Sequence, residues 1–196
     1  KLKKDREVVL TAVKNDGGAL EYALKKFQKD REVVLEAVKN DACAIHYASE
    51  ALKKDWEVVL EAMKKEVEAL NFASDAIKND LEFMLAAVKE NGWALKFASE
   101  KLKNDRKFML EAMKTCGRQM YLAPEKFRKD REVVLAAANN HASALMFASK
   151  ELQKHPEVLA AVKKHAKVLQ FKKNRERVLA FMKRFGGAMW WESEDK

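Results

Sequence analysis

Acidic side chains return along this chain every 25 residues, and paired carboxylates can serve as general acid and base. A carboxylate that occupies the same place in every unit is better explained as a helix N-cap, whose oxygens accept hydrogen bonds from the free amides of the first turn. We therefore expect caps, not catalytic groups, at these aspartates. They are Asp5, Asp30, Asp55, Asp80, Asp105 and Asp130, and His155 continues the series.

Histidine and cysteine are the other side chains here with metal-binding or nucleophilic chemistry. A zinc site needs three or four converging ligands, and no third ligand accompanies any pair of the histidines, which are His46, His141, His155 and His165. Cys43 and Cys116 lie three units apart, too far for a disulfide in a stacked array. No base or oxyanion motif surrounds either thiol. The sequence therefore predicts no catalytic residue, no metal site and no cofactor.

These residues belong to an internal repeat, which defines the elements that position them. An apolar stretch after each aspartate predicts a first helix, and residues 15–18 supply a break where Asn or Gly suits a left-handed C-terminal position. A second helix then carries an apolar position and a ring position, and stacking is expected to bury both. The ring position holds Tyr22, Tyr47, Phe72, Phe97, Leu122 and Phe147. Two further sets are expected in the core. They are Leu10, Leu35, Leu60, Leu85, Leu110 and Leu135 in the first helix, and Leu20, Ile45, Leu70, Leu95, Met120 and Leu145 in the second.

Six repeats are full length, a seventh runs from Leu152 to about Lys173, and an eighth begins near Asn174. Helices of about ten residues are marginal alone, because nucleation costs more than so few backbone bonds return. The repeats must therefore stack, and we predict an all-α protein, an α-solenoid of about eight helix-turn-helix units. Pro124 is expected to kink or end a second helix, whereas Pro156 suits a first helical position.

Composition agrees with this fold class. The chain has 196 residues, of which 48% are hydrophobic and 35% charged, with only six glycines and two prolines, too few for a hairpin-rich sheet protein. No apolar run reaches the length of a membrane span, and two cysteines favour an intracellular compartment. We expect one continuous solenoid, with regular repeats over 1–151, degenerate repeats over 152–191 and an acidic tail over 192–196.

The repeated string resembles a known family. Asp-Arg-Glu-Val-Val-Leu, then Ala-Val-Lys-Asn, then Ala-Leu, an aromatic residue and Ala-Ser are similar to the tandem repeats of the domain-of-unknown-function family numbered 4116. The resemblance is clearest at 30–39, 91–99 and 130–138 and fades after Lys154. It implies tandem helical repeats, and it supplies no catalytic residues, because the family has no assigned activity.

Binding residues in a repeat protein are found where the occupant of a position changes. Arginine follows the capping aspartate in four repeats, but Trp56 and Leu81 stand there in the third and fourth. Trp and Tyr are common anchors of interfaces, although Trp56 and Trp93 could equally fill gaps between repeats. The predicted interface residues are Trp56, Leu81, Trp93, Tyr121, Met146, Trp190 and Trp191.

Most of the formal net charge of +9 lies between Lys163 and Arg184, where nine basic residues accompany one acid, Glu176. A local basic patch suits an anionic partner, which could be an acidic protein surface, lipid headgroups or nucleic acid. Its basic residues are Lys163, Lys164, Lys167, Lys172, Lys173, Arg175, Arg177, Lys183 and Arg184.

These observations favour a non-enzymatic scaffold or architectural subunit that binds other proteins in a larger assembly. Terminal repeats normally carry a polar cap, and neither end of this chain does, which predicts further chain or a bound neighbour. The alternative is nonspecific nucleic-acid binding by the basic end, with a steep salt dependence. A third possibility, an enzyme of unrecognised type, would need a pocket with perturbed ionisable groups.

Overall fold

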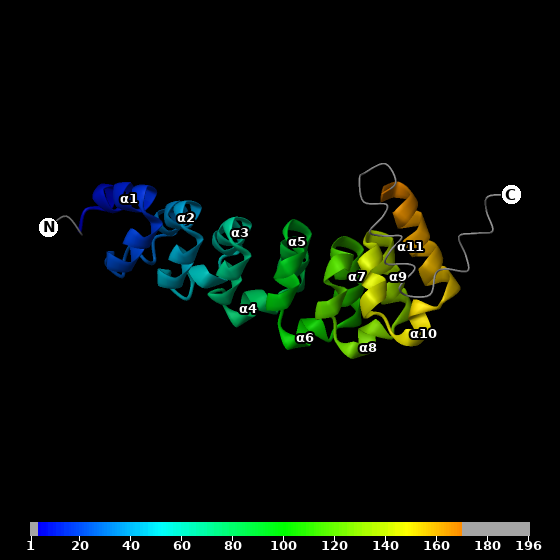
Figure 1. The fold of residues 1–196 in the computed structure, drawn as a ribbon. Coiled ribbons are helices and arrows are strands. Elements are labelled where there is room, and N and C mark those ends of the chain that lie inside the picture. The colour runs from blue at the N-terminus through cyan, green and yellow to red at the C-terminus, as the bar shows by residue number, and fades with distance from the viewer. Residues whose placement is uncertain (1–3, 170–196) are drawn as a thin grey trace. The chain divides into compact units, whose positions relative to one another are not determined.

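The computed structural model describes residues 4–169, with side chains placed up to residue 164. Every element within this range is helical, and 25-residue repeats follow one another along the chain (Figure 1). The chain is an all-α repeat solenoid, as the sequence predicts. It divides between Leu102 and Lys103 into two compact units. We number the repeats from the capping residue, so that repeat 1 begins at Asp5 and repeat 7 at His155.

Each full repeat contains a long α-helix, a 3₁₀ helix and a final single turn. The long helices are α1 (Arg6–Asn15), α2 (Arg31–Asn40), α3 (Trp56–Lys65), α5 (Leu81–Glu90), α7 (Arg106–Cys116), α9 (Arg131–Asn140) and α11 (Pro156–Leu169). The 3₁₀ helices are η2 (Gly17–Tyr22), η3 (Ala42–Tyr47), η5 (Val67–Asn71), η6 (Gly92–Phe97), η7 (Gly117–Leu122) and η8 (Ala142–Phe147). The final turn is helical in η4 (Leu52–Lys54), α4 (Asp75–Lys78), α6 (Glu100–Lys103), α8 (Glu125–Arg128) and α10 (Lys150–Gln153).

The repeated aspartates are N-caps, as predicted. The Asp5 carboxylate accepts hydrogen bonds from the amides of Glu7 and Val8, and the aspartates before α2, α3, α5, α7 and α9 do the same for their helices. Glu7 in the first turn and Lys14 in the last complement the dipole of α1. Pro156 is the first residue of α11, which confirms the position predicted for it.

The break after the long helix is not the left-handed turn that the sequence predicts. Asp16 is extended, with φ −145° and ψ 107°, and its carboxylate accepts from the amide of Gly18. Asp41, Asn91 and His141 cap their 3₁₀ helices in the same way. One extended residue is sufficient to redirect the chain, because its side chain caps the second element and no left-handed residue is needed.

The predicted second helix is also wrong as a single element. After η2 the chain passes through an extended residue, Ala23, with φ −72° and ψ 150°, before the final turn begins. 3₁₀ helices rarely continue beyond a few residues because their hydrogen-bond geometry is poor. Pro124 is therefore the N-cap residue of the separate turn α8 and does not interrupt a helix.

The core lies between the two layers of helices. The apolar set of the 3₁₀ helices is buried as predicted, from Leu20 to Leu145. In the leucine set of the long helices only Leu35 is buried. The other five members are half-buried, and they are Leu10, Leu60, Leu85, Leu110 and Leu135. Valine and methionine one residue earlier take the fully buried place, and these residues include Val34, Val59, Met84, Met109 and Val134.

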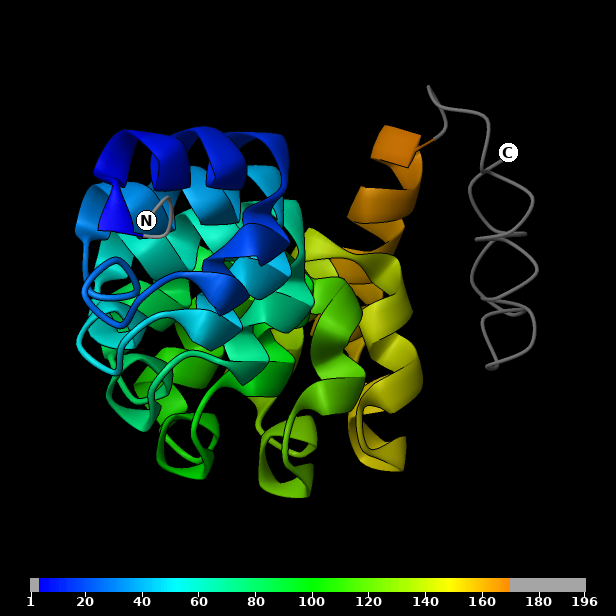
Figure 2. The same cartoon turned by 90° about the vertical axis from the view of Figure 1, so that its left-hand side faces the viewer.

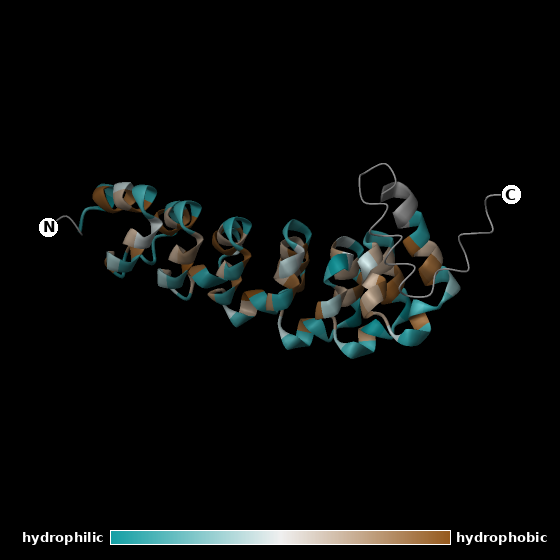
Figure 3. Ribbon diagram, in the orientation of Figure 1, coloured by the Kyte–Doolittle hydropathy of each residue, from teal (hydrophilic) through white to brown (hydrophobic). Residues whose placement is uncertain are grey.

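Within the first unit α1, α2, α3 and α5 lie side by side in chain order, and η2, η3, η5 and η6 form a second layer beside them (Figure 1, Figure 2). In the second unit α7, α9 and α11 pack in the same order. Each long helix carries hydrophobic and hydrophilic segments (Figure 3), which is typical of helices with one covered side. None of the helices between residues 4 and 169 combines the length and hydrophobicity needed to cross a bilayer.

We predict that Leu70→Ala lowers the free energy of unfolding by about 2 to 5 kcal/mol, as truncation of a fully buried leucine does. Leu70 has no exposed surface. Leu60→Ala, at a half-buried position in the same repeat, should cost less. Urea denaturation followed by circular dichroism measures both variants. Equal losses would contradict this assignment of the core.

Candidate interaction surfaces

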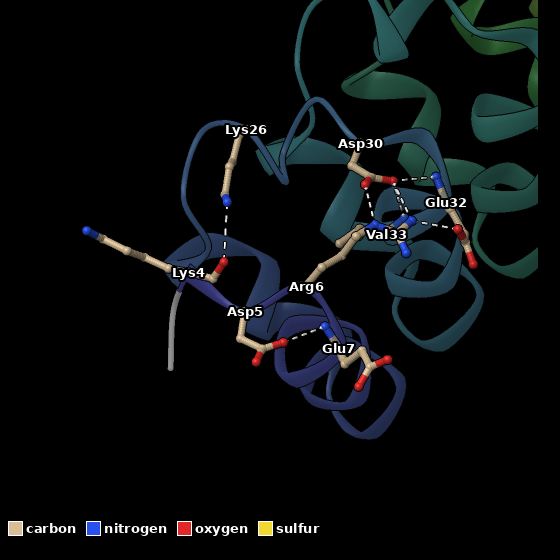
Figure 4. Close-up of polar contacts among 8 residues, drawn as sticks. All are labelled: Lys4, Asp5, Arg6, Glu7, Lys26, Asp30, Glu32 and Val33. Carbon is tan, nitrogen blue, oxygen red and sulfur yellow. Dashed lines mark hydrogen bonds and ion pairs between the residues drawn. The ribbon is translucent and has the colours of Figure 1, made fainter. Parts of the chain in front are cut away.

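Arg6, at the start of repeat 1, forms ion pairs with two acidic residues of repeat 2. The Arg6 guanidinium donates from Nε to Oδ2 of Asp30 at 2.8 Å and from Nη2 to Oε2 of Glu32 at 2.5 Å (Figure 4). Asp30 also accepts from the amides of Glu32 and Val33. One carboxylate thus caps α2 and binds the preceding repeat. We call this set of arginine, aspartate and glutamate the clamp.

Between residues 4 and 164 the clamp recurs in every repeat that has arginine after the capping residue. Sequence reasoning noted these arginines as occupants of a variable position but did not identify their partners, which lie 24 and 26 residues further on. The constant spacing between each arginine and these two acidic residues is the feature of the sequence that would have identified the partners. His155 replaces the aspartate in repeat 7, so the last clamp has a single carboxylate. The clamps are Arg6 with Asp30 and Glu32, Arg31 with Asp55 and Glu57, Arg106 with Asp130 and Glu132, and Arg131 with Glu157.

The clamps keep their aspartates ionised. Hydrogen bonds from Arg6 lower the pKa of Asp30 below its ordinary value of 3.8, although partial burial opposes them. Arg31 lowers the pKa of Asp55 in the same way, and Arg106 that of Asp130. The side chains remain partly exposed to solvent, where single ion pairs add little stability. The fork of the guanidinium therefore serves mainly to set the register between neighbouring repeats.

Further hydrogen bonds fasten neighbouring repeats. In repeat 2 the Asn40 side chain accepts from the amide of Gly17 at 2.9 Å and donates to the carbonyl of Lys14 at 2.9 Å. The amide of Ser49 donates to the carbonyl of Gln28 in repeat 1 at 2.9 Å. A Cβ at Gly17 would overlap the carbonyl of Ala37, so glycine permits this close approach.

Trp56, a predicted interface residue, occupies the clamp position of repeat 3. Its ring meets Phe83 of repeat 4 edge-on, with 5.2 Å between centroids, and Phe83 is fully buried. The indole is still 39% exposed. An aromatic contact therefore replaces the ion pair here, and the gap-filling alternative describes Trp56 well. Leu81, at the same position of repeat 4, is half-buried.

A row of exposed or half-exposed rings runs across the 3₁₀ helices of the first unit. The sequence predicts these rings in the core, but each lies at the last residue of its 3₁₀ helix or directly after it and keeps part of its surface exposed. The His46 ring lies 4.8 Å from the Phe72 ring, and a hydrogen bond to Glu21 raises the pKa of Tyr47. We call this set the aromatic row, which consists of Tyr22, Tyr47, Phe72 and Phe97.

The other predicted interface residues lie in different places. Trp93 is at the start of η6 with its side chain 51% exposed, and the side chain of Asn91 accepts from its amide at 3.0 Å. In the second unit Met146 is exposed, and the half-buried Tyr121 ring lies 5.5 Å from that of Phe147. Trp190 and Trp191 lie outside the described residues.

The basic patch is described only at its beginning. Lys163 is half-buried and Lys164 exposed, both on α11. The side chain of Lys167 and the remaining basic residues lie outside the part of the chain whose side chains are placed, so their role stays a prediction. They are Lys172, Lys173, Arg175, Arg177, Lys183 and Arg184.

The two cysteines are the candidate nucleophiles, and the acidic, histidine and cysteine side chains are the candidate metal ligands. Burial raises the pKa of Cys116 to about 12, and burial with nearby Asp41 and Glu66 raises that of Cys43, so neither thiol is activated as a nucleophile. Between residues 4 and 164 no group of three His, Cys, Asp or Glu side chains could hold a metal ion.

An open hollow of about 960 Å³ adjoins the aromatic row at Tyr47. Lys25 and Glu50 are among the residues that line it.

Comparison with known proteins identifies the repeat. The family model described as Domain of unknown function (DUF4116) matches residues 1–28, 30–78, 55–103, 80–121 and 105–153. No curated protein and no solved structure matches the chain.

We predict that Asp55→Ala costs about 1 kcal/mol through loss of the cap alone, and more because the clamp is lost with it. Asp55→Asn keeps a capping oxygen but removes the charge that Arg31 binds, so it should lie between wild type and Asp55→Ala. Thermal unfolding of the three proteins measures the order. An Asn variant as unstable as the Ala variant would contradict the double role of this carboxylate.

The clamp should also depend on pH. Because the pKa of Asp55 is lowered in the folded state, its contribution is complete above the ordinary pKa of 3.8 and is lost as the pH falls through the lowered value. Arg31→Gln should therefore be less stable than wild type at pH 7, and the difference should shrink below about pH 4. Urea denaturation across this range tests it, and a difference independent of pH would refute it.

Proposed function

We propose that this chain, which belongs to the DUF4116 family, is a non-enzymatic helical-repeat scaffold that binds other proteins within a larger assembly. The observation that carries the proposal is the aromatic row, together with the exposed Trp93 at the start of η6. Large apolar groups gathered on a surface are typical of protein interaction sites, and Trp and Tyr are frequent anchors there.

The rigidity of the first unit supports this role. Clamps join repeat 1 to repeat 2 and repeat 2 to repeat 3, and the contact of Trp56 with Phe83 joins repeat 3 to repeat 4. The rings are therefore carried by elements whose register is fixed before a partner arrives. A preorganised surface loses less conformational entropy on binding.

The hollow lined by Tyr47 gives this surface a concave region that a partner's side chains can fill. Its lining carries both charges, because it includes Lys25, Lys29 and Lys53 as well as Glu21 and Glu50. A polar rim around apolar rings is the usual arrangement of a protein interface. The raised thiol pKa values also favour binding over covalent catalysis, since a nucleophilic cysteine requires a lowered pKa.

The basic patch favours a second candidate function, nonspecific binding of nucleic acid. Phe171, Phe181 and Phe185 lie among its lysines and arginines, and stacking rings with cations suit single strands. The affinity for an oligonucleotide should then fall steeply with salt. Binding that ignores salt would exclude this candidate.

Trp93→Ser tests the scaffold proposal. Wild type and variant are purified from native cells at moderate salt, and the co-purifying proteins are identified by mass spectrometry. We expect Trp93→Ser to reduce recovery of at least one partner about tenfold, as loss of an anchor residue does. Lys89→Ser, at an exposed position on α5, is the matched control and should retain that partner.

The proposal fails if the wild-type protein retains no partner, or if Trp93→Ser retains every partner as the control does. Circular dichroism of both variants shows whether the fold persists, so a loss of binding is not confused with unfolding.

A further inference from the structure

The junction between repeats 3 and 4 has the two carboxylates of a clamp but no arginine. Asp80 and Glu82, at the start of α5, occupy the positions of the carboxylates that bind Arg6 between repeats 1 and 2 (Figure 4). Trp56 stands at the position of the arginine. Between residues 4 and 164 no cationic side chain forms an ion pair with Asp80 or Glu82. We call Trp56, Asp80 and Glu82 the open clamp.

The carboxylate of Asp80 is fixed to its helix in the same way as the carboxylates that bind arginine. Its Oδ1 accepts a hydrogen bond from the amide of Phe83 at 2.8 Å. In the filled clamp, Oδ1 of Asp30 accepts from the amide of Val33 at 3.2 Å, and Oδ2 accepts from Nε of Arg6 at 2.8 Å. Asp80 is exposed where Asp30 is half-buried. The helix cap of repeat 4 therefore presents to solvent the carboxylate that elsewhere accepts a guanidinium.

Trp56 adds an aromatic surface to these carboxylates. Its ring contacts Phe83, the residue whose amide is bonded to Asp80, so the ring and the carboxylate lie at the start of the same helix. Trp56 is still 39% exposed. Among aromatic side chains tryptophan attracts cations most strongly, and the planar guanidinium of arginine stacks on such a ring. The open clamp thus combines a surface for stacking with two negative charges.

The filled clamps show which group such carboxylates bind. In the part of the chain that the structure describes, four arginines donate to carboxylates at these positions, each from the preceding repeat. A metal ion would need at least a third ligand, and between residues 4 and 164 no group of three suitable side chains occurs. The fork of a guanidinium also matches a carboxylate better than the ammonium of lysine does. Arginine is therefore the side chain that the open clamp fits, and a partner must supply it.

We propose that the open clamp binds an arginine side chain of a partner protein, with the guanidinium paired to Asp80 and Glu82 and stacked on Trp56. The contact repeats between two proteins the interaction that joins neighbouring repeats within this one. It goes beyond the scaffold proposal, because it uses neither the aromatic row nor Trp93. Its failure would therefore leave that proposal unaffected.

Titration with a short peptide, acetyl-alanyl-arginyl-alanine amide, followed by nuclear magnetic resonance, tests the proposal. Two signals report on the site, the indole N–H of Trp56 and the backbone amide of Phe83, which is bonded to Asp80. Both should shift saturably, with a dissociation constant on the order of 1 mM, as expected for one charged side chain held by charge-assisted hydrogen bonds. The same peptide with citrulline, a neutral analogue of arginine, should shift neither signal.

Four variants separate the parts of the site. Asp80→Asn keeps a capping oxygen but removes the charge, and Glu82→Gln removes the second charge, so each should weaken binding about tenfold. Glu68→Gln, the same kind of change at an exposed position on η5, is the control and should bind like wild type. Trp56→Arg supplies the missing arginine from within the chain, so the amide of Phe83 should no longer respond to the peptide.

The proposal is overturned if neither wild-type signal shifts saturably up to about 10 mM peptide, tenfold above the expected constant. Equal binding of the citrulline peptide also overturns it, as does wild-type affinity in Asp80→Asn and Glu82→Gln, or in Trp56→Arg. Circular dichroism of every variant shows whether the fold persists, so that a loss of binding is not confused with unfolding of repeat 4.

Discussion

The long helices from α1 to α9 have only ten or eleven residues each. In water such a helix does not persist without a neighbour that covers its apolar side. The other features of the structure follow from this constraint. Val33 and Ala37 are buried only because repeat 1 lies against them, while Val8 and Ala12, at the same positions, are exposed. Stability is therefore a property of neighbouring repeats together, as expected of a repeat array.

The polar contacts between repeats fix the register of neighbouring helices, whereas the apolar contacts provide most of the stability. Burial of the Leu20 set provides the driving force, but apolar contacts alone allow neighbouring helices to slide. The clamp fixes their register, because Asp30 must cap α2 and meet Arg6 with the same carboxylate. Where Trp56 replaces the arginine, the ring contact with Phe83 takes over this role. The sequence can therefore vary at the clamp position as long as some contact spans the two repeats.

Much of the fold follows from the sequence, because the repeat places a cap, an apolar set and a break in every unit. The caps and the buried set from Leu20 to Leu145 are as predicted. The second helix was wrong, because a period-based pattern does not distinguish a 3₁₀ helix and a separate turn from one continuous helix. For the same reason the sequence predicts that Pro124 kinks or ends a helix, although it is the N-cap residue of the separate turn α8.

The candidate surfaces were less predictable. Ring positions repeat as regularly as core positions, so periodicity alone placed Tyr47 and Phe72 in the core, and only the packing shows them half-exposed. Trp56 and Trp93 look alike in the sequence, yet Trp56 meets Phe83 of the next repeat, whereas Trp93 lies at the start of η6 and is 51% exposed. The division of the chain at residue 151 and the roles of Trp190 and Trp191 stay predictions.

Hydrogen exchange of an Ile45→Ala variant tests the dependence of each repeat on its neighbours most directly. Ile45 is fully buried in repeat 2. The account predicts faster amide exchange in α1 and α3 as well as in α2, because the flanking repeats lose the support of the one between them. Acceleration confined to repeat 2, with α1 and α3 exchanging as in wild type, would contradict it.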